Sequence, residues 1–178
     1  MQAFRYVVGF DPSTTRFGVA CGGERDSKPT SFVWPLPGAE PHVFDRTLSV
    51  AFSSASELLL ACKATDVFIE APIIIAASST HTMMSLIQLV GAVRAAAARA
   101  GVRSHMVATS TVRKHFIQQG NLKSAEAKRA VMDRCRLLGY AITDDNSADA
   151  CAVWNYGISL VCPKWSPQGT PMFAGART

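Results

Sequence analysis

Three carboxylate side chains stand at points of the sequence where regular elements end or begin. Asp11 and Glu70 each follow a short apolar run, and Asp149 lies near the start of a helical pattern. Parallel neighbouring strands bring their carboxyl ends to one edge of a sheet, where a helix packed over that edge adds its own side chains. We therefore expect Asp11, Glu70 and Asp149 to converge.

Converging carboxylates repel one another, and burying them ionised without a counter-ion is costly. A divalent cation would compensate this charge, and hard oxygen ligands without a His or Cys set favour Mg²⁺, with Mn²⁺ as an alternative. Two such ions about 4 Å apart can activate a water and stabilise the leaving oxygen of a phosphodiester. The three acids thus predict a site for two Mg²⁺ ions that acts on a phosphodiester.

Positive charge is concentrated in one part of the chain, between residues 90 and 140. This segment has ten lysines and arginines against two acids, whereas the whole chain has a formal net charge of +5. Such a distribution favours a surface that binds a polyanion, although a solvated helical surface has the same composition. The predicted DNA-binding residues are Arg94, Arg113, Lys114, Lys123, Lys128 and Arg129. Lys128 is also a candidate for catalysis.

The elements that must position these residues can be read from periodicity. Apolar runs at residues 4–10, 16–21 and 31–34 with short connections predict an antiparallel meander. Helical spacing at residues 44–62 and 81–100 then alternates with short strands at residues 67–69 and 102–107. Three further helices are predicted at residues 110–118, 124–138 (with Ser124 as its cap) and 145–161. We predict a five-stranded mixed α/β sheet with helices on both faces, in which strands one to three are antiparallel and strands four and five are parallel to strand one.

A chain of 178 residues is long enough for one sizeable core. We expect one domain over residues 1–162 and a tail rich in Pro and Gly over residues 163–178. No run of 18 apolar residues and no signal sequence stand out, which predicts a cytoplasmic protein that does not enter a membrane.

Four segments carry a resemblance to a known family. They are Val7-Val-Gly-Phe-Asp-Pro-Ser-Thr-Thr-Arg-Phe-Gly-Val-Ala20, Val67-Phe-Ile-Glu-Ala71, Gln88-Leu-Val-Gly91 and Asp144-Asp-Asn-Ser-Ala-Asp-Ala150. In this order they resemble the RuvC family of Holliday junction resolvases, within the ribonuclease H-like superfamily, over about residues 4–161. The stretch Val112-Arg-Lys-His-Phe116, with Gly120, Lys123 and Ala127-Lys-Arg129, is similar to the compact phage-type branch of that family.

The resemblance implies a ribonuclease H-like fold and a homodimer that nicks two strands of like polarity in a four-way DNA junction, leaving 5′-phosphates and 3′-hydroxyls. It matches Asp11 to the acid that bridges both metals, Glu70 to the acid of the fourth strand and Asp149 to the acid of the last helix. It also implies a role in DNA recombination and repair, in a bacterial or phage-infected bacterial cell. For the dimer surface we expect a stripe on one helix, unless that stripe packs on the protein's own sheet; its residues are Met84, Ile87, Gly91 and Ala95.

The chain departs from the family pattern at three places. Ser13 stands where the family often has Gly, isoleucines occupy residues 73–75 where an aromatic wedge often follows, and Asn146 stands where an acid or histidine is usual. Asn146 is therefore one candidate for the fourth position facing the metals. Asp145 is the favoured candidate because its charge would help to hold two cations. If Asp145 serves the metals, Asn146 is expected to cap the last helix; the alternative is that Asp145 itself is the cap.

Other interpretations use the same residues. Asp11 before Pro12 could begin a turn, and Asp149 could complement a helix dipole. A protein on this fold could bind branched DNA without cutting it, or the Asp-rich first turn could belong to a nucleotide-binding protein of the actin-like superfamily.

Overall fold

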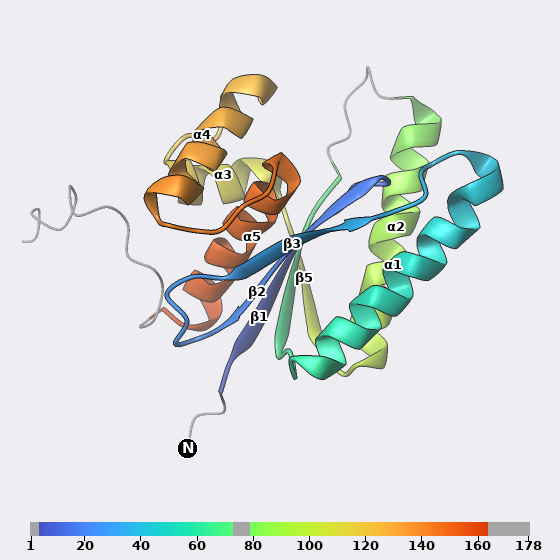
Figure 1. Cartoon of the computed structure of the whole chain (residues 1–178), viewed down its shortest axis with the longest axis horizontal. Helices are drawn as coiled ribbons and strands as arrows, with labels where there is room; N and C mark the ends of the chain where they lie inside the picture. Colours follow the sequence, from blue (N-terminus) through green and yellow to red (C-terminus); the bar gives the residue numbers. More distant parts are fainter. Residues whose placement is uncertain (1–3, 73–78, 164–178) are drawn as a thin grey trace, which may run out of the picture.

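The computed structural model describes residues 4–72 and 79–163, which form one twisted sheet between two layers of helices (Figure 1). The elements in chain order are β1 (Tyr6–Asp11), β2 (Arg16–Gly23), β3 (Thr30–Pro35), α1 (Pro41–Ala61), β4 (Asp66–Glu70), α2 (Thr80–Arg99), β5 (Arg103–Val107), α3 (Thr109–Ile117), α4 (Ser124–Leu137) and α5 (Asp145–Val161). None of the helices in the described ranges is long and apolar enough to span a membrane. The isoleucines at residues 73–75 and nearly all of the predicted tail lie outside the described residues.

The sheet has the order β3-β2-β1-β4-β5. The pairs β1–β2 and β2–β3 are antiparallel, whereas β4 pairs with β1 and with β5 in parallel. Helices α1 and α2 make the crossovers that parallel pairing requires. The predicted five-stranded mixed sheet and the direction of every strand are confirmed.

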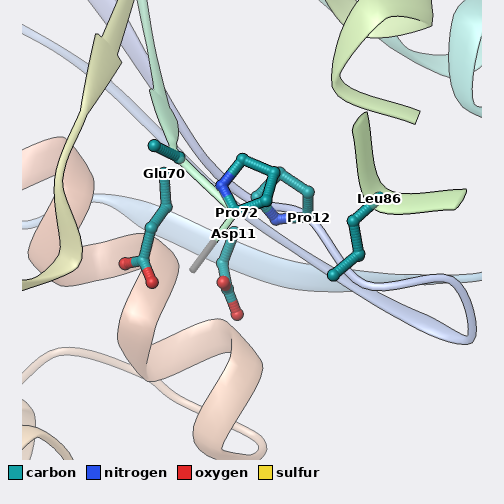
Figure 2. Close-up of a pocket in the computed structure, with 6 residues that line it drawn as sticks. Asp11, Pro12, Glu70, Pro72 and Leu86 are labelled. Atoms are coloured by element: carbon teal, nitrogen blue, oxygen red, sulfur yellow. The ribbon is translucent and has the colours of Figure 1, made fainter. Parts of the chain in front are cut away.

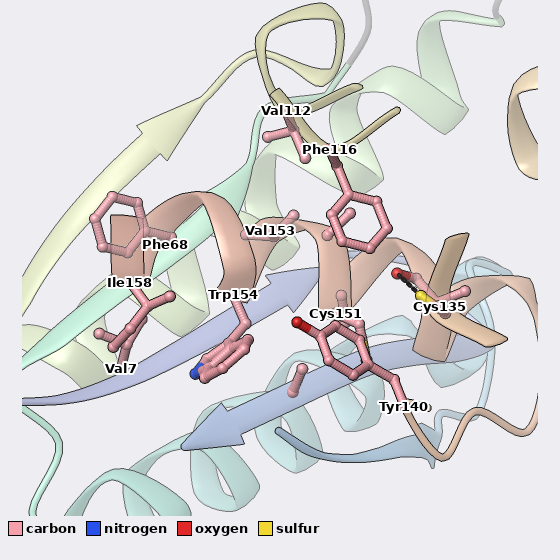
Figure 3. Packing of buried hydrophobic residues seen from close by; sticks show 14 of the residues in the cluster. Val7, Phe68, Val112, Phe116, Cys135, Tyr140, Cys151, Val153, Trp154 and Ile158 are labelled. Carbon is pink, nitrogen blue, oxygen red and sulfur yellow. Dashed lines mark hydrogen bonds between the residues drawn. The ribbon is translucent and has the colours of Figure 1, made fainter. Parts of the chain in front are cut away.

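Each face of the sheet has its own core. On one face, α1 and α2 cover an aliphatic and aromatic cluster that includes Phe10, Phe17 and Leu89. On the other face, α5 lies against the sheet and α3 and α4 pack against α5, as Figure 1 shows. The second core surrounds Trp154, which is fully buried (Figure 3).

Helix α5 approaches the central strand so closely that Gly9 of β1 has no room for a side chain. A Cβ atom at Gly9 would lie 2.5 Å from the backbone nitrogen of Trp154. Trp154 in turn donates from its indole nitrogen to the Gly22 carbonyl oxygen at 3.3 Å. Backbone-to-backbone packing of this kind leaves α5 little freedom to shift over the sheet.

The cap of α4 differs from the prediction. Helix α4 has Lys123, not Ser124, as its N-cap residue, and no side chain bonds to the free backbone N–H groups there. Ser124 is the first helical residue, so its hydroxyl is not placed to accept from the first turn as a cap side chain would.

Candidate active site

Asp11 and Glu70 are the last residues of two parallel strands, β1 and β4, that pair side by side. The register pairs Phe10 with Ile69, so the two acids come next along the ladder. Figure 2 shows both carboxylates pointing in the same direction from this edge of the sheet. They line a hollow of about 230 Å³ together with Pro12, Ala71, Pro72 and Leu86.

Asp149 reaches the same region from the first turns of α5. The start of α5 rests on β2 at Gly18, the residue that pairs with Asp11 in the β1–β2 ladder. A Cβ atom at Gly18 would lie 2.2 Å from the carbonyl oxygen of Asn146, so only glycine allows this approach. The close contact sets how near α5 comes to the end of β1.

Burial raises the pKa values of all three acids, and neighbouring acids act on two of them. Burial raises the pKa of Asp11 well above its ordinary value, and the charges of Glu70 and Asp149 raise it further. Burial, followed by the charge of Glu70, raises the pKa of Asp149 to about 7. Burial also raises the pKa of Glu70. Asp11 and Asp149 thus each lie near enough to another acid for its negative charge to disfavour their ionised forms.

Two cationic side chains face this cluster from α3 and α4. Lys128 Nζ donates to Asp145 Oδ2 at 2.5 Å, and this bond and the charges of Asp145, Asp149 and Asp11 raise the pKa of Lys128 against the opposing effect of burial. The charge of Arg113 lowers the pKa values of both Glu70 and Asp149, against the larger effect of burial. In the described part of the chain, neither cation forms an ion pair within 4 Å with Asp11, Glu70 or Asp149.

The residues fit divalent cations by their chemistry rather than by preformed ligand geometry. Within the described ranges, no three His, Cys, Asp or Glu side chains lie close enough to hold a metal ion as they stand. The carboxylates of Asp11 and Asp149 are nonetheless partly buried and close enough to raise each other's energy, and neither has an ion-pair partner among these residues. Carboxylate oxygens with uncompensated charge are the ligands that Mg²⁺ and Mn²⁺ prefer.

The structure separates the roles of three neighbouring residues at the start of α5. Asp144 is the N-cap: it accepts from the Ser147 backbone at 2.8 Å, and Ser147 Oγ accepts from the Asp144 backbone at 3.0 Å. Arg16, at the start of β2, forms an ion pair with Asp144. Burial acts in the opposite sense, but the hydrogen bonds from Ser147 and Arg16 lower the pKa of Asp144. The expectation that Asn146 caps the helix is therefore wrong, and so is the alternative that Asp145 caps it.

Asp145 instead turns toward the carboxylate cluster. Its carboxylate bonds to Lys128, and its charge raises the pKa values of Asp11 and Asp149. As the first helical residue, Asp145 has passed the position from which a side chain can cap its own helix.

The predicted DNA-binding residues fall into two groups. Arg113 and Lys114 on α3 and Lys123, Lys128 and Arg129 at α4 belong to the helical layer that carries Asp149. Lys128 and Arg129 line a groove that also includes Asp144 and Asp145. Arg94 lies on α2, in the layer on the opposite face of the sheet (Figure 1). Five of the six residues thus lie in the layer that carries Asp149, and Arg94 lies in the other layer.

Sequence reasoning missed three residues that shape the site. Arg16 holds the cap of α5, Gly18 admits the start of α5, and Thr109 donates from Oγ1 to Glu70 Oε1 at 2.6 Å. Gly18 could have been suspected from its pairing opposite Asp11, whereas no local pattern marks Arg16 or Thr109, because their partners are distant in the sequence.

No protein-family model matches the sequence, and no curated protein sequence is significantly similar to it. The fold, however, matches solved structures. Thermus thermophilus RuvC in complex with a Holliday junction substrate superposes with a TM-score of 0.71 at 19% identity, over 91% of this chain and 98% of that chain. A second Thermus thermophilus RuvC structure superposes with a TM-score of 0.67 at 19% identity, over 89% of this chain and 96% of that chain.

The yeast mitochondrial Holliday junction resolvase, Ydc2, has a TM-score of 0.58 at 10% identity, over 89% of this chain and 82% of that chain. All three similarities extend over most of this chain. The chain therefore has the ribonuclease H-like fold of RuvC-type Holliday junction resolvases.

Proposed function

We propose that this protein is a divalent-metal-dependent endonuclease that resolves four-way DNA junctions. The observation that carries the proposal is that Asp11 and Glu70 end two paired parallel strands and line one hollow, where the charges of Glu70 and Asp149 raise the pKa of Asp11. None of the three acids has an ion-pair partner among the described residues. The shared fold with a RuvC captured on a Holliday junction supports DNA as the substrate. A role in recombination or repair of DNA follows from that substrate.

In this proposal Asp11, Glu70 and Asp149 hold two Mg²⁺ ions, or Mn²⁺ in their place. When bound, such ions supply an acidified water and stabilise the charge on the phosphodiester. Asp145 serves the same ions, either as a ligand itself or through a hydrogen bond to a ligand. Its charge already acts on Asp11 and Asp149. Asn146 is the neutral alternative at this position.

Lys128 and Arg113 bring positive charge to the same place. Lys128 faces Asp145, Asp149 and Asp11, where it can stabilise negative charge on a phosphate at the reacting centre. Arg113 Nε is buried and lacks a hydrogen-bond partner in the part of the chain that the structure describes. A buried donor of this kind gains most from an anionic acceptor, which a DNA phosphate would supply.

The DNA backbone would lie along α3 and α4. Lys114 on α3, Lys123 at the N-cap of α4 and Arg129 on α4 are all exposed. Phosphate contacts from such side chains provide most of the affinity for DNA without reading its sequence. Arg94 would contribute only if a junction arm reaches the opposite layer.

We propose a homodimer because two nicks in one junction require two active sites. The α2 stripe of Met84, Ile87, Gly91 and Ala95 is exposed, with Met84 47% and Ile87 45% accessible. The alternative that this stripe packs on the protein's own sheet is wrong, since Leu89, Val93 and their neighbours do so. Exposed apolar side chains at helical spacing suit a self-complementary C2 contact.

Cleavage of defined DNA tests the proposal. Labelled four-way, Y-shaped and linear DNA are incubated with the protein in Mg²⁺, in Mn²⁺ and in EDTA, with the Asp11→Asn protein as the matched control. We expect paired nicks in the four-way junction with either cation, none in EDTA and none with Asp11→Asn. Junction binding without cleavage in both cations would instead support a protein that binds branched DNA without cutting it.

A further inference from the structure

Glu70 is the only one of the three acids whose side chain accepts a hydrogen bond from a described residue. Its partner is Thr109, the first residue of α3, whose hydroxyl donates to Oε1 at 2.6 Å. This distance is typical of an O–H donor to an ionised carboxylate, which is among the stronger hydrogen bonds in proteins. Thr109 is only 5% exposed, so water competes little for its hydroxyl.

The sheet itself places these two residues together. Glu70 pairs with Val107 in the parallel β4–β5 ladder, and the next amide, that of Ala71, donates to the Val107 carbonyl at 2.8 Å. Thr109 follows two residues later as the chain turns into α3. Its branched Cβ restricts side-chain rotation, so the hydroxyl is a stiff donor. The contact is therefore a consequence of strand register and not of two mobile surface side chains meeting.

The same helix provides a second group that acts on Glu70. Arg113 lies four residues after Thr109, one helical turn on, and its charge reaches both Glu70 and Asp149. Residues four apart share one face of a helix. The first two turns of α3 thus bring a hydroxyl and a guanidinium to the end of β4.

We propose that Thr109 is a positioning residue for Glu70: its hydroxyl holds one carboxylate oxygen so that the other is directed to the divalent cation. This inference rests on the proposed function and adds to it a residue outside the carboxylate set. A glutamate has three rotatable bonds, and a partner that orients a metal-binding carboxylate typically changes metal affinity or activity by about 10–100-fold when removed. Thr109 would act through Glu70 and not touch the cation.

The test compares Thr109→Val, which keeps the shape and removes the hydroxyl, with Thr109→Ser, which keeps the hydroxyl. Thr111→Val is the matched control, because Thr111 is an exposed threonine of the same helix whose side chain makes no hydrogen bond to Glu70. Thr109→Ala is a second hydroxyl-free variant, should valine impair folding. Binding of Mn²⁺ to the DNA-free protein is measured by electron paramagnetic resonance, and junction affinity in EDTA and single-turnover cleavage are measured in parallel.

We expect Thr109→Val and Thr109→Ala to bind Mn²⁺ about tenfold more weakly and to cleave about tenfold more slowly, with junction affinity unchanged and Thr109→Ser close to the original protein. If both hydroxyl-free variants bind Mn²⁺ like Thr111→Val, the positioning role is overturned while the proposed nuclease stands. If the unaltered protein neither binds Mn²⁺ nor cleaves, the proposed function fails, and this inference fails with it.

Discussion

The two helical layers of this protein cover the same sheet in different ways. Helix α5 packs against glycines, so closely that side chains at Gly9 and Gly18 would meet its backbone. Helices α1 and α2 cover the other face through larger side chains such as Phe10, Phe17 and Leu89. Asp149 and Asp145 belong to the α5 layer and their charges act on Asp11, whereas α2 leaves an apolar stripe exposed.

This difference indicates which helices have a closely fixed position on the sheet. Side-chain packing can relax by rotamer changes, but contact between backbones cannot. The helix whose position determines the distances among carboxylates is the one in backbone contact with the sheet. The other layer is free to vary on its outer surface, where we propose association.

The largest loss of cleavage should follow substitution of the three acids proposed for the site, and not of acids elsewhere in the chain. Asp11→Asn, Glu70→Gln and Asp149→Asn should each lower the cleavage rate by about a thousandfold or more, because residues that act as a unit lose activity together. Junction affinity should persist, since the basic helices remain. Glu57→Gln, in the exposed surface of α1, is the matched control and should cleave normally. Near-normal rates in any two of the three site variants would remove the metal-site proposal.

A side chain at Gly18 should have the next largest effect. Gly18→Ala puts a Cβ atom 2.2 Å from the Asn146 carbonyl oxygen, so α5 must move away from β1. We expect cleavage to fall by about a hundredfold, the cost of a misplacement near 1 Å, and the free energy of unfolding to fall by about 1–3 kcal/mol. Gly91→Ala on α2 meets no atom within 4 Å and should raise the melting temperature instead. Equal melting temperatures for the two variants would contradict the contrast between the layers.

Within α5, neighbouring acids should respond differently. Asp145→Asn should raise the Mg²⁺ concentration needed for cleavage or slow cleavage about tenfold, as loss of a group that serves a metal does. Asp144→Ala should mainly lower stability, by about 1 kcal/mol for a lost N-cap. A Mg²⁺ titration of cleavage together with thermal unfolding separates the two. An unchanged Mg²⁺ requirement in Asp145→Asn would remove Asp145 from the site.

The salt dependence of junction binding should distinguish the cations of the two layers. Arg113→Ala should weaken binding a few-fold and reduce the slope of log K against log salt by about one, as expected for a lost phosphate contact. Lys128→Ala should flatten the slope similarly. Arg94→Ala should have less effect because Arg94 lies on α2, in the layer opposite to α3 and α4. A larger slope change for Arg94→Ala would place DNA on the α2 side.

The smallest effect should appear in the pH dependence of stability without divalent cations. The pKa of Asp149 is raised in the fold from 3.8 to about 7. Between these values the folded protein binds more protons than the unfolded chain, so stability should fall as pH rises through this window. We expect the melting temperature to be a few degrees lower at pH 8 than at pH 5. This difference in melting temperature should be smaller in Asp149→Asn and unchanged in Asp45→Asn, a control on α1. Added Mg²⁺ should raise the melting temperature more at pH 8, where the carboxylates are ionised.

The sequence by itself determined the elements, their order and the three acids at their ends. Apolar runs, helical spacing and Pro12 act over a few residues, so local patterns are enough to assign Asp11 and Glu70 to strand ends. The predicted sheet followed from the order of these elements and the rules for connecting strands.

Only the tertiary structure decided which polar side chains contact one another. Asp144 and Asp145 are adjacent in the sequence, yet they form ion pairs with different partners. Asp144 pairs with Arg16 of β2, and Asp145 pairs with Lys128 of α4. The bond from Thr109 to Glu70 and the contact of Gly18 with Asn146 are of the same kind. Such contacts depend on register and on the close approach of α5 to the sheet, which are properties of the packed molecule and leave no periodic pattern in the sequence.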